Sequence, residues 1–124
     1  MNQHTFSGMP HDHGDIHEVL ERLPDKEICA ITADAFKQLG DGTRLQIFWL
    51  LCHSEECVAN IAAAVDMTPP AVSHHLRCLK QAGLIVGRRI GKEVRYSLAQ
   101  TEEAVLMHAM VDALLKSKCP TCKA

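Results

Sequence analysis

The sequence predicts a mainly α-helical fold of the winged helix-turn-helix type, with five to six helices and a two-stranded β-wing. One observation is a short helix over 69–81, which the Thr68 hydroxyl can cap and which Gly83 ends. A second is the pair of strand-like runs that follows at 84–86 and 93–98, with a glycine turn between them. A short helix followed by a hairpin is the outline of a recognition helix and its wing.

Further helices are expected on both sides of this unit, because apolar residues recur at three- and four-residue spacing. The segment that Thr43 opens, RLQIFWLLC, is almost wholly apolar, so we expect it to be the central core helix. The segments 57–65 and 69–81 form the helix-turn-helix. The expected helices are 15–23, 26–39, 43–52, 57–65, 69–81 and 104–115.

The last expected helix, which Thr101 caps, is apolar around nearly its whole girth. Such a terminal helix leaves apolar surface facing water, so we expect it to pack against a second subunit. A helix-turn-helix also needs a dimer to match two half-sites on DNA. The sequence therefore predicts a homodimer formed through terminal helices.

Positive charge is concentrated in the predicted recognition helix and wing. Between Ser73 and Arg95, six basic residues stand against Glu93 alone, a sum of +5. Residues 1–66 carry four basic and eleven acidic residues, a sum of −7, and the whole chain is −2. Phosphate contacts dominate affinity for nucleic acids, so this pattern favours double-stranded DNA as partner over a merely solvated basic surface.

The composition indicates one globular domain over 25–118, between an N-terminal arm at 1–24 and a tail at 119–124. No stretch is apolar enough for a membrane span or signal peptide, so we expect a cytoplasmic protein without a membrane partner. Its six cysteines are then expected as thiols, metal ligands or redox sensors rather than structural disulfides. No nucleophile with a base, glycine-rich phosphate loop or HExxH motif is present, which argues against an enzyme.

The arm and the tail both carry metal-binding side chains. His11, Asp12 and His13 offer two imidazoles and a carboxylate within three residues. Cys119 and Cys122 form a Cys-x-x-Cys pair, which can bind metal through two thiolates or form a disulfide. Each group also has a plain interpretation, as terminal side chains without a dedicated role.

Four motifs, LGDGTRLQIFWLL, ECVANIA, AVSHHLRCLKQAGLIVGRR and GKEVRYSL, span most of the chain from about Ile28 to Leu115. Together they resemble the ArsR/SmtB family of metal-responsive transcriptional repressors. The resemblance implies a dimer that binds an imperfect palindrome in its own promoter and that metal releases. One departure is Pro69-Pro70, where the family usually has polar residues. The resemblance implies DNA contacts at Pro70, Ser73, His74, Arg77, Arg88, Arg89, Lys92 and Arg95.

The resemblance also implies a metal-sensing site. The family often has Cys-Val-x-Asp or Cys-Val-Cys before the recognition helix, where this chain reads Cys57-Val58-Ala59-Asn60. In such members an upstream Cys or His completes the site, and His11 and His13 lie at matching spacing. We therefore expect Cys57, His11 and His13, with Cys52 or Asp12 as further candidates, to bind zinc or cadmium.

Other family sites match this chain less well. The final-helix site falls on Gln100, Glu102, Ala113 and Lys116, which do not make a metal site. His108 and Asp112 lie one turn apart on that helix, either as a hydrogen-bonded pair or, across a two-fold axis, as half of a site. Cys78 with Cys119 and Cys122 would suit a soft metal or arsenite. The expected inducer is zinc, cadmium or arsenite, and the alternative is a thiol-based redox or sulfide-responsive repressor of the same fold.

Overall fold

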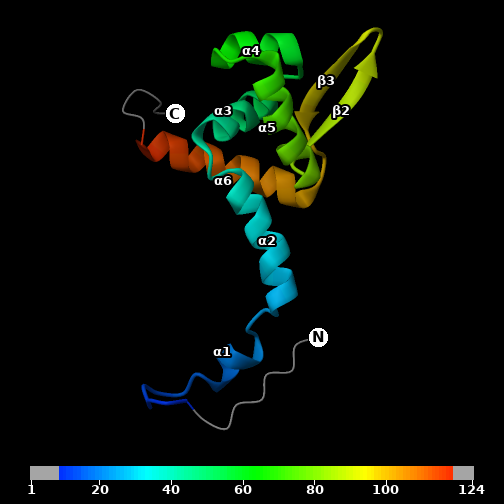
Figure 1. The fold of residues 1–124 in the computed structure, drawn as a ribbon. Coiled ribbons are helices and arrows are strands. Elements are labelled where there is room, and N and C mark those ends of the chain that lie inside the picture. The colour runs from blue at the N-terminus through cyan, green and yellow to red at the C-terminus, as the bar shows by residue number, and fades with distance from the viewer. Residues whose placement is uncertain (1–8, 119–124) are drawn as a thin grey trace. The chain divides into compact units, whose positions relative to one another are not determined.

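The computed structural model describes residues 9–118, which form six α-helices and one three-stranded antiparallel sheet (Figure 1). The mainly helical winged helix-turn-helix prediction is confirmed. Within these residues no helix has the length and apolarity needed to cross a membrane. The elements are α1 (His17–Glu21), α2 (Lys26–Gln38), α3 (Gly42–His53), β1 (Glu56–Cys57), α4 (Val58–Val65), α5 (Pro69–Gln81), β2 (Ile85–Ile90), β3 (Glu93–Leu98) and α6 (Glu102–Lys118).

The chain divides into two compact units, Met1–Ala33 and Asp34–Ala124, and the boundary falls inside α2. The first unit holds α1 and the first half of α2. The second holds the helix-turn-helix, the sheet and α6.

Side-chain caps begin three of the helices in the second unit. Thr68 and Thr101 accept hydrogen bonds from the backbone N–H three residues on, as predicted for α5 and α6. For α3 the prediction was wrong by one residue, because Asp41 and not Thr43 determines the start. A carboxylate oxygen of Asp41 accepts from the backbone N–H of Arg44 at 2.9 Å, and this bond lowers the pKa of Asp41.

The end of α5 is fixed by a left-handed glycine. Gly83 has φ +76°, its N–H donates to the carbonyl of Lys80, and the N–H of Leu84 donates to the carbonyl of Leu79. This pattern of two hydrogen bonds is the Schellman motif, and the buried Leu79 and Leu84 supply its usual apolar contact. The predicted stop at Gly83 therefore leads directly into the wing.

The sheet has the order β1-β3-β2 and is larger than the predicted two-stranded wing. Strand β2 runs to Ile90, beyond the expected 84–86. The additional strand β1 pairs Glu56 with Tyr96 and Cys57 with Arg95. Cys57 was expected to open a helix. Its extended backbone (φ −86°, ψ 166°) instead places it in β1, immediately before α4.

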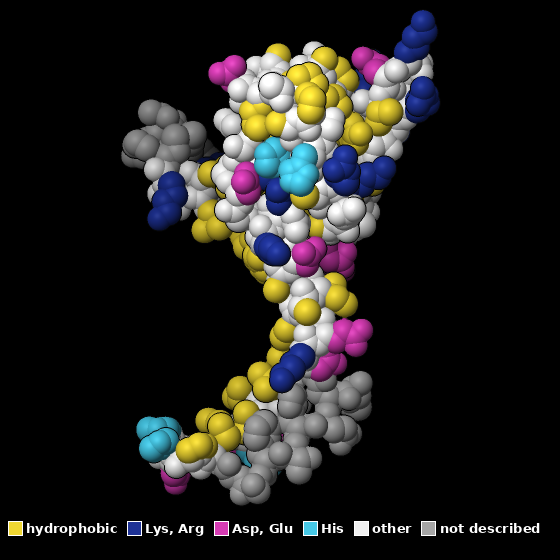
Figure 2. All heavy atoms as spheres, in the orientation of Figure 1, with side chains coloured by type: hydrophobic (Ala, Val, Ile, Leu, Met, Phe, Trp, Pro, Cys, Tyr) yellow, Lys and Arg dark blue, Asp and Glu magenta, His cyan; other side chains and the backbone are white. Residues whose placement is uncertain are grey.

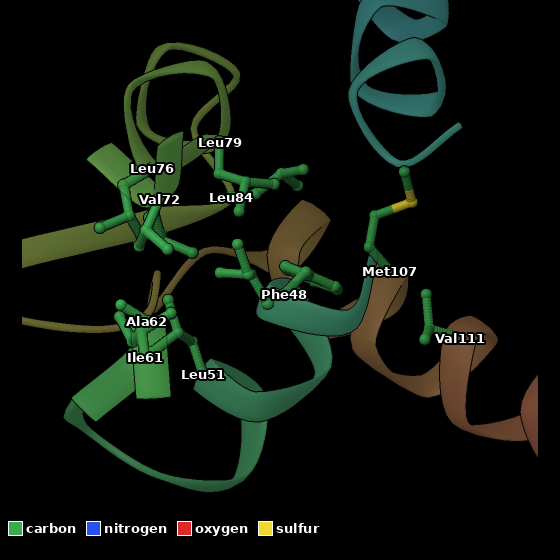
Figure 3. Packing of buried hydrophobic residues seen from close by; sticks show 12 residues of the cluster. Phe48, Leu51, Ile61, Ala62, Val72, Leu76, Leu79, Leu84, Met107 and Val111 are labelled. Atoms are coloured by element: carbon green, nitrogen blue, oxygen red, sulfur yellow. The ribbon is translucent and has the colours of Figure 1, made fainter. Parts of the chain in front are cut away.

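The core of the second unit lies where α3, α4, α5 and α6 meet (Figure 3). Phe48 of α3 is fully buried, which confirms the prediction of a central apolar helix. Each large apolar side chain buried here contributes about 1.5–3 kcal/mol to folding. Among residues 9–118 every fully buried side chain is hydrophobic; the main members are Ile47, Phe48, Leu51, Ile61, Val72, Leu76, Leu79, Leu84, Met107 and Val111.

Helix α6 buries only one of its apolar faces. Ala104, Met107 and Val111 face the core, whereas Leu106 is 62% exposed and Leu114 is 55% exposed. The second apolar face is therefore open in the single chain, as expected for a helix that has a partner.

Candidate nucleic-acid interface and metal site

Helix α5 has a buried stripe and an outward polar side. Its apolar stripe of Val72, Leu76 and Leu79 packs into the core, so the side chains between these positions face out. Of the four α5 residues predicted to contact DNA, Ser73 is half-buried and Pro70, His74 and Arg77 are exposed. Figure 2 shows histidine and basic side chains together on one face of this unit.

His75, which lies next to these residues, packs toward α3. The Nε–H of Arg44 donates to Nδ1 of His75 at 3.1 Å, and an Nη1–H of Arg44 donates to Oε1 of Gln38 at 2.6 Å. Partial burial lowers the pKa of His75, and the adjacent Arg44 charge lowers it further. His75 is therefore a packed, half-buried side chain rather than an exposed one. It also joins α3 to the recognition helix.

Two arginines of the wing are paired with carboxylates. Arg88 is held by a fork of two hydrogen bonds to Glu55, at 2.7 and 2.8 Å, and this pair raises the pKa of Arg88. Arg95 bonds Glu93 at 2.9 Å and lies opposite Arg88 in the β2–β3 register. Both arginines therefore already have a carboxylate partner.

Two predicted wing contacts remain free. Arg89 and Lys92 are exposed, and within residues 9–118 neither forms an ion pair. Figure 2 shows basic side chains projecting at the tip of the hairpin. Within the wing, the cations available to an incoming phosphate without rearrangement are therefore at its tip.

The predicted metal ligands come from both units of the chain. His11 and His13 are exposed in the first unit, with ring centroids 5.9 Å apart. Cys57 has a free, half-buried thiol in the second unit. Cys119 and Cys122 lie outside the described residues. The ligand set of Cys57, His11 and His13 therefore stays a prediction.

Two other cysteines of the second unit are half-buried free thiols. Burial raises the pKa of Cys52 to about 12, and the nearby Asp112 charge adds to this effect. Such a thiol holds its proton at neutral pH, so a metal ion would have to displace that proton before Cys52 could bind it. Cys78 Sγ lies 3.9 Å from Nε2 of His74, next to the outward polar side of α5.

A histidine–aspartate cluster joins the end of α3 to the middle of α6. Nε2 of His53 donates to Oδ1 of Asp112 at 3.3 Å, and Nε2 of His108 lies 2.9 Å from Oδ2 of the same carboxylate. The two rings meet edge to face, with centroids 4.9 Å apart. Within the described residues this is the one group of three such side chains close enough to share a metal ion.

Sequence reasoning found two members of this cluster and missed the third. His108 and Asp112 were recognised as neighbours on one helix, and the short distance between them is confirmed. His53 lies far away in sequence, at the last residue of α3. No local spacing marks it, because only the packing of α3 against α6 brings it close.

Comparison with known proteins identifies the second unit. A family model described as "Bacterial regulatory protein, arsR family" matches residues 41–86, from Asp41 into β2. The transcriptional repressor SmtB homolog of Synechocystis is 39% identical over 85 residues, which is 68% of this chain and 64% of that protein. The regulator KmtR of Mycobacterium tuberculosis is 33% identical over 96 residues, which is 77% of this chain and 71% of that protein. The chain belongs to the ArsR family.

Solved structures similar to this ArsR-family protein have the same fold. A possible transcriptional regulatory protein from Mycobacterium bovis, fragment 1–100, is 32% identical with a TM-score of 0.64 and covers 75% of this chain and 99% of that one. A solution structure from the same organism is described as a homodimeric winged helix-turn-helix DNA-binding domain. It is 29% identical, with a TM-score of 0.63, and covers 88% of this chain and 92% of that one. This chain spans slightly less than two thirds of the Synechocystis protein.

Proposed function

We propose that this ArsR-family protein is a homodimeric repressor that binds operator DNA and is released by a metal or metalloid ion. The observation that carries the proposal is the outward side of α5, where polar and basic side chains stand beside a wing with a basic tip. Names of relatives support it: one is an arsenical resistance operon repressor of Escherichia coli, 43% identical over 65 residues, which are 56% of that protein.

In the proposed complex, α5 lies in the major groove and the wing on the phosphate backbone. Ser73 and His74 donate to bases or phosphates, and Arg77 pairs with phosphate or guanine. Pro70 sits at the helix start, closest to the groove. Arg89 and Lys92 take phosphates directly, whereas Arg88 and Arg95 must first exchange their carboxylate partners.

The proposed inducer is zinc, cadmium or arsenite. A thiolate from Cys57 with imidazoles from His11 and His13 would suit zinc or cadmium, and the pair Cys119 and Cys122 would add two further thiolates for a softer ion. The exposed imidazoles and the half-buried free thiol of Cys57 support this donor set. Bound metal would supply a positive charge and a cross-link between its ligands.

Fluorescence anisotropy on DNA from upstream of the protein's own gene tests the proposal. Arg77→Ala and Arg89→Ala should each weaken binding at least fivefold, and each should reduce the salt slope by about 1. Lys118→Ala, which removes the same charge at the end of α6, is the matched control and should leave affinity unchanged. Equal affinity for all three variants would contradict the proposed interface.

The same assay identifies the inducer. Zinc, cadmium or arsenite should lower DNA affinity of the reduced protein, and Cys57→Ser should weaken that response. Release by a polysulfide but by no metal would instead support the thiol-based repressor.

A further inference from the structure

We propose that His53, His108 and Asp112 form a site for a divalent transition-metal ion of the zinc, cobalt or nickel type, built within a single protomer. The site is distinct from the Cys57, His11 and His13 set. Metal binding here is independent of the proposed function, whereas its effect on DNA binding rests on that function.

The three side chains have the donor types and spacing that such an ion needs. Two imidazole nitrogens and one carboxylate oxygen are common ligands of zinc, cobalt and nickel. Their ligand atoms all lie within 4.8 Å of one another. Bonds of about 2.0–2.2 Å place neighbouring ligand atoms roughly 3.0–3.5 Å apart, so only small side-chain adjustments are required.

Nε2 of His108 is the atom that most favours a bound ion here. This nitrogen is shielded from solvent and has no well-directed hydrogen bond, although Oδ2 of Asp112 lies 2.9 Å away. A buried polar atom without a hydrogen bond is costly, and each such atom requires an explanation. An ion bound by both Nε2 and the carboxylate would satisfy the nitrogen and bring the two groups into one coordination sphere.

The surroundings hold the ligands in place and leave an open side. The ring of Trp49 lies against His53 with centroids 4.5 Å apart, which restricts the imidazole. The side chains of His53, Asp112 and His108 are 41%, 30% and 25% exposed. An ion can therefore enter from solvent and keep water in its remaining coordination positions.

The site lies at one end of a helix whose other end contacts the recognition helix. His53 is the last residue of α3, and Arg44, in its first turn, donates to His75 of α5. An ion that links α3 to α6 would restrict motion between these helices. Because α6 is also the proposed dimer helix, occupancy would change how the two recognition helices are held relative to each other. We expect lower affinity for operator DNA.

Cobalt titration of the full-length, reduced protein tests the site without DNA. The background variant combines Cys57→Ser, Cys119→Ser and Cys122→Ser with His11→Gln and His13→Gln, which removes the competing ligands proposed above. It should bind Co²⁺ with visible d–d absorption and no thiolate charge-transfer band. Adding His53→Gln or His108→Gln should weaken binding at least tenfold. His17→Gln, an exposed histidine paired with Glu21, is the matched control and should have no effect.

Two results would overturn the metal site: no Co²⁺ binding by the background variant, or binding that is indifferent to His53→Gln and His108→Gln. If these variants do not fold, the wild-type protein provides the test. Imidazole ¹⁵N resonances of His53 and His108 should shift on addition of Zn²⁺, and unchanged resonances would reject the site.

A separate measurement with operator DNA tests whether metal binding at this site also lowers DNA affinity. Zn²⁺ should lower DNA affinity of the background variant at least fivefold, and His108→Gln should remove this effect. Zinc binding without any change in DNA affinity would overturn the regulatory role alone. A protein that binds no operator DNA would overturn the proposed function, while the cobalt titration would still decide the metal site.

Discussion

Gly83 determines how the recognition helix is joined to the wing. Its left-handed backbone places two N–H groups on the last carbonyls of α5, and the next residue, Leu84, is already in the core. A residue with a Cβ adopts this conformation at a cost of about 1–2 kcal/mol. The junction therefore depends on glycine for its backbone, since the space around a Cβ is open there.

Gly83→Ala should lower the free energy of unfolding by about 1 kcal/mol, measured by urea denaturation. Gly42→Ala is the matched control. Gly42 is the first residue of α3, has no positive φ, and a Cβ there would meet nothing within 4 Å. That variant should be as stable as the wild type or slightly more stable. Equal losses in both variants would show that the backbone conformation of Gly83 is not the cause.

His75 should make stability depend on pH. Burial and Arg44 lower its pKa below the unfolded value of 6.5, so the folded state resists taking up the proton. Its contribution is fully present above pH 6.5 and is lost as pH falls through the lower folded pKa. Urea midpoints between pH 7 and about pH 5 should fall more steeply for the wild type than for His75→Gln. Parallel curves for the two proteins would contradict this role.

At the scale of single residues, sequence reasoning succeeded where the cause is local. The hydroxyls of Thr68 and Thr101 and the glycine at Gly83 act within a few residues, so their roles could be predicted. The start of α3 was predicted one residue late, because Asp41 and not Thr43 caps the helix. His53 could not be recognised, since its partners come from another helix.

At the scale of elements, the wing is partly neutralised by the loop after α3. Glu55 holds Arg88 with two hydrogen bonds, which lower the pKa of the Glu55 carboxyl, and the charge of Arg95 acts in the same direction. A carboxylate beside two arginines that we propose to contact DNA weakens the local attraction for phosphate. Glu55 therefore limits how much of the wing's charge is available.

Glu55→Gln should tighten binding to operator DNA, because it frees Arg88 and removes a negative charge from the interface. We expect roughly five- to tenfold higher affinity at 0.1 M salt and a salt slope that is steeper by about 1. Asp34→Asn, on α2, changes net charge equally and should have little effect. Anisotropy titrations at several salt concentrations measure both quantities. Unaltered affinity in Glu55→Gln would mean that Arg88 does not reach the DNA.

The short strand β1 shows why one element could not be predicted. Two residues, Glu56 and Cys57, are too few to carry a period-two pattern. They become a strand only because β3 offers free backbone groups beside them. The longer strands carry their own alternation and turn signal, so the hairpin itself was predictable.

At the scale of the whole molecule, the exposed face of α6 is the main apolar surface left uncovered by the second unit. Leu106 and Leu114 are more than half exposed, at 62% and 55%. The side chains on the core-facing side of the same helix are already buried. Pairing two such faces would remove this apolar area from water, which is the main driving force for stable association.

Leu106→Glu should convert the proposed dimer into a monomer without unfolding it, because the side chain is mostly exposed in the single chain. Light scattering after size-exclusion chromatography measures the mass directly. Val86→Glu places the same charge on an exposed apolar position of the wing, 45% exposed, and should leave the dimer intact. A Leu106→Glu protein that keeps the dimer mass would show that association uses another surface.

The small size of β1 makes this strand the part of the sheet that opens most easily. Its two residue pairs join parts of the chain about forty residues apart, whereas β2 and β3 are neighbours in sequence and pair along six positions. Local opening is cheapest where few backbone bonds close a long loop. The third strand should therefore open and close while the hairpin stays intact. The thiol of Cys57 would then be uncovered in brief intervals, and the rate of its reactions would report that opening equilibrium.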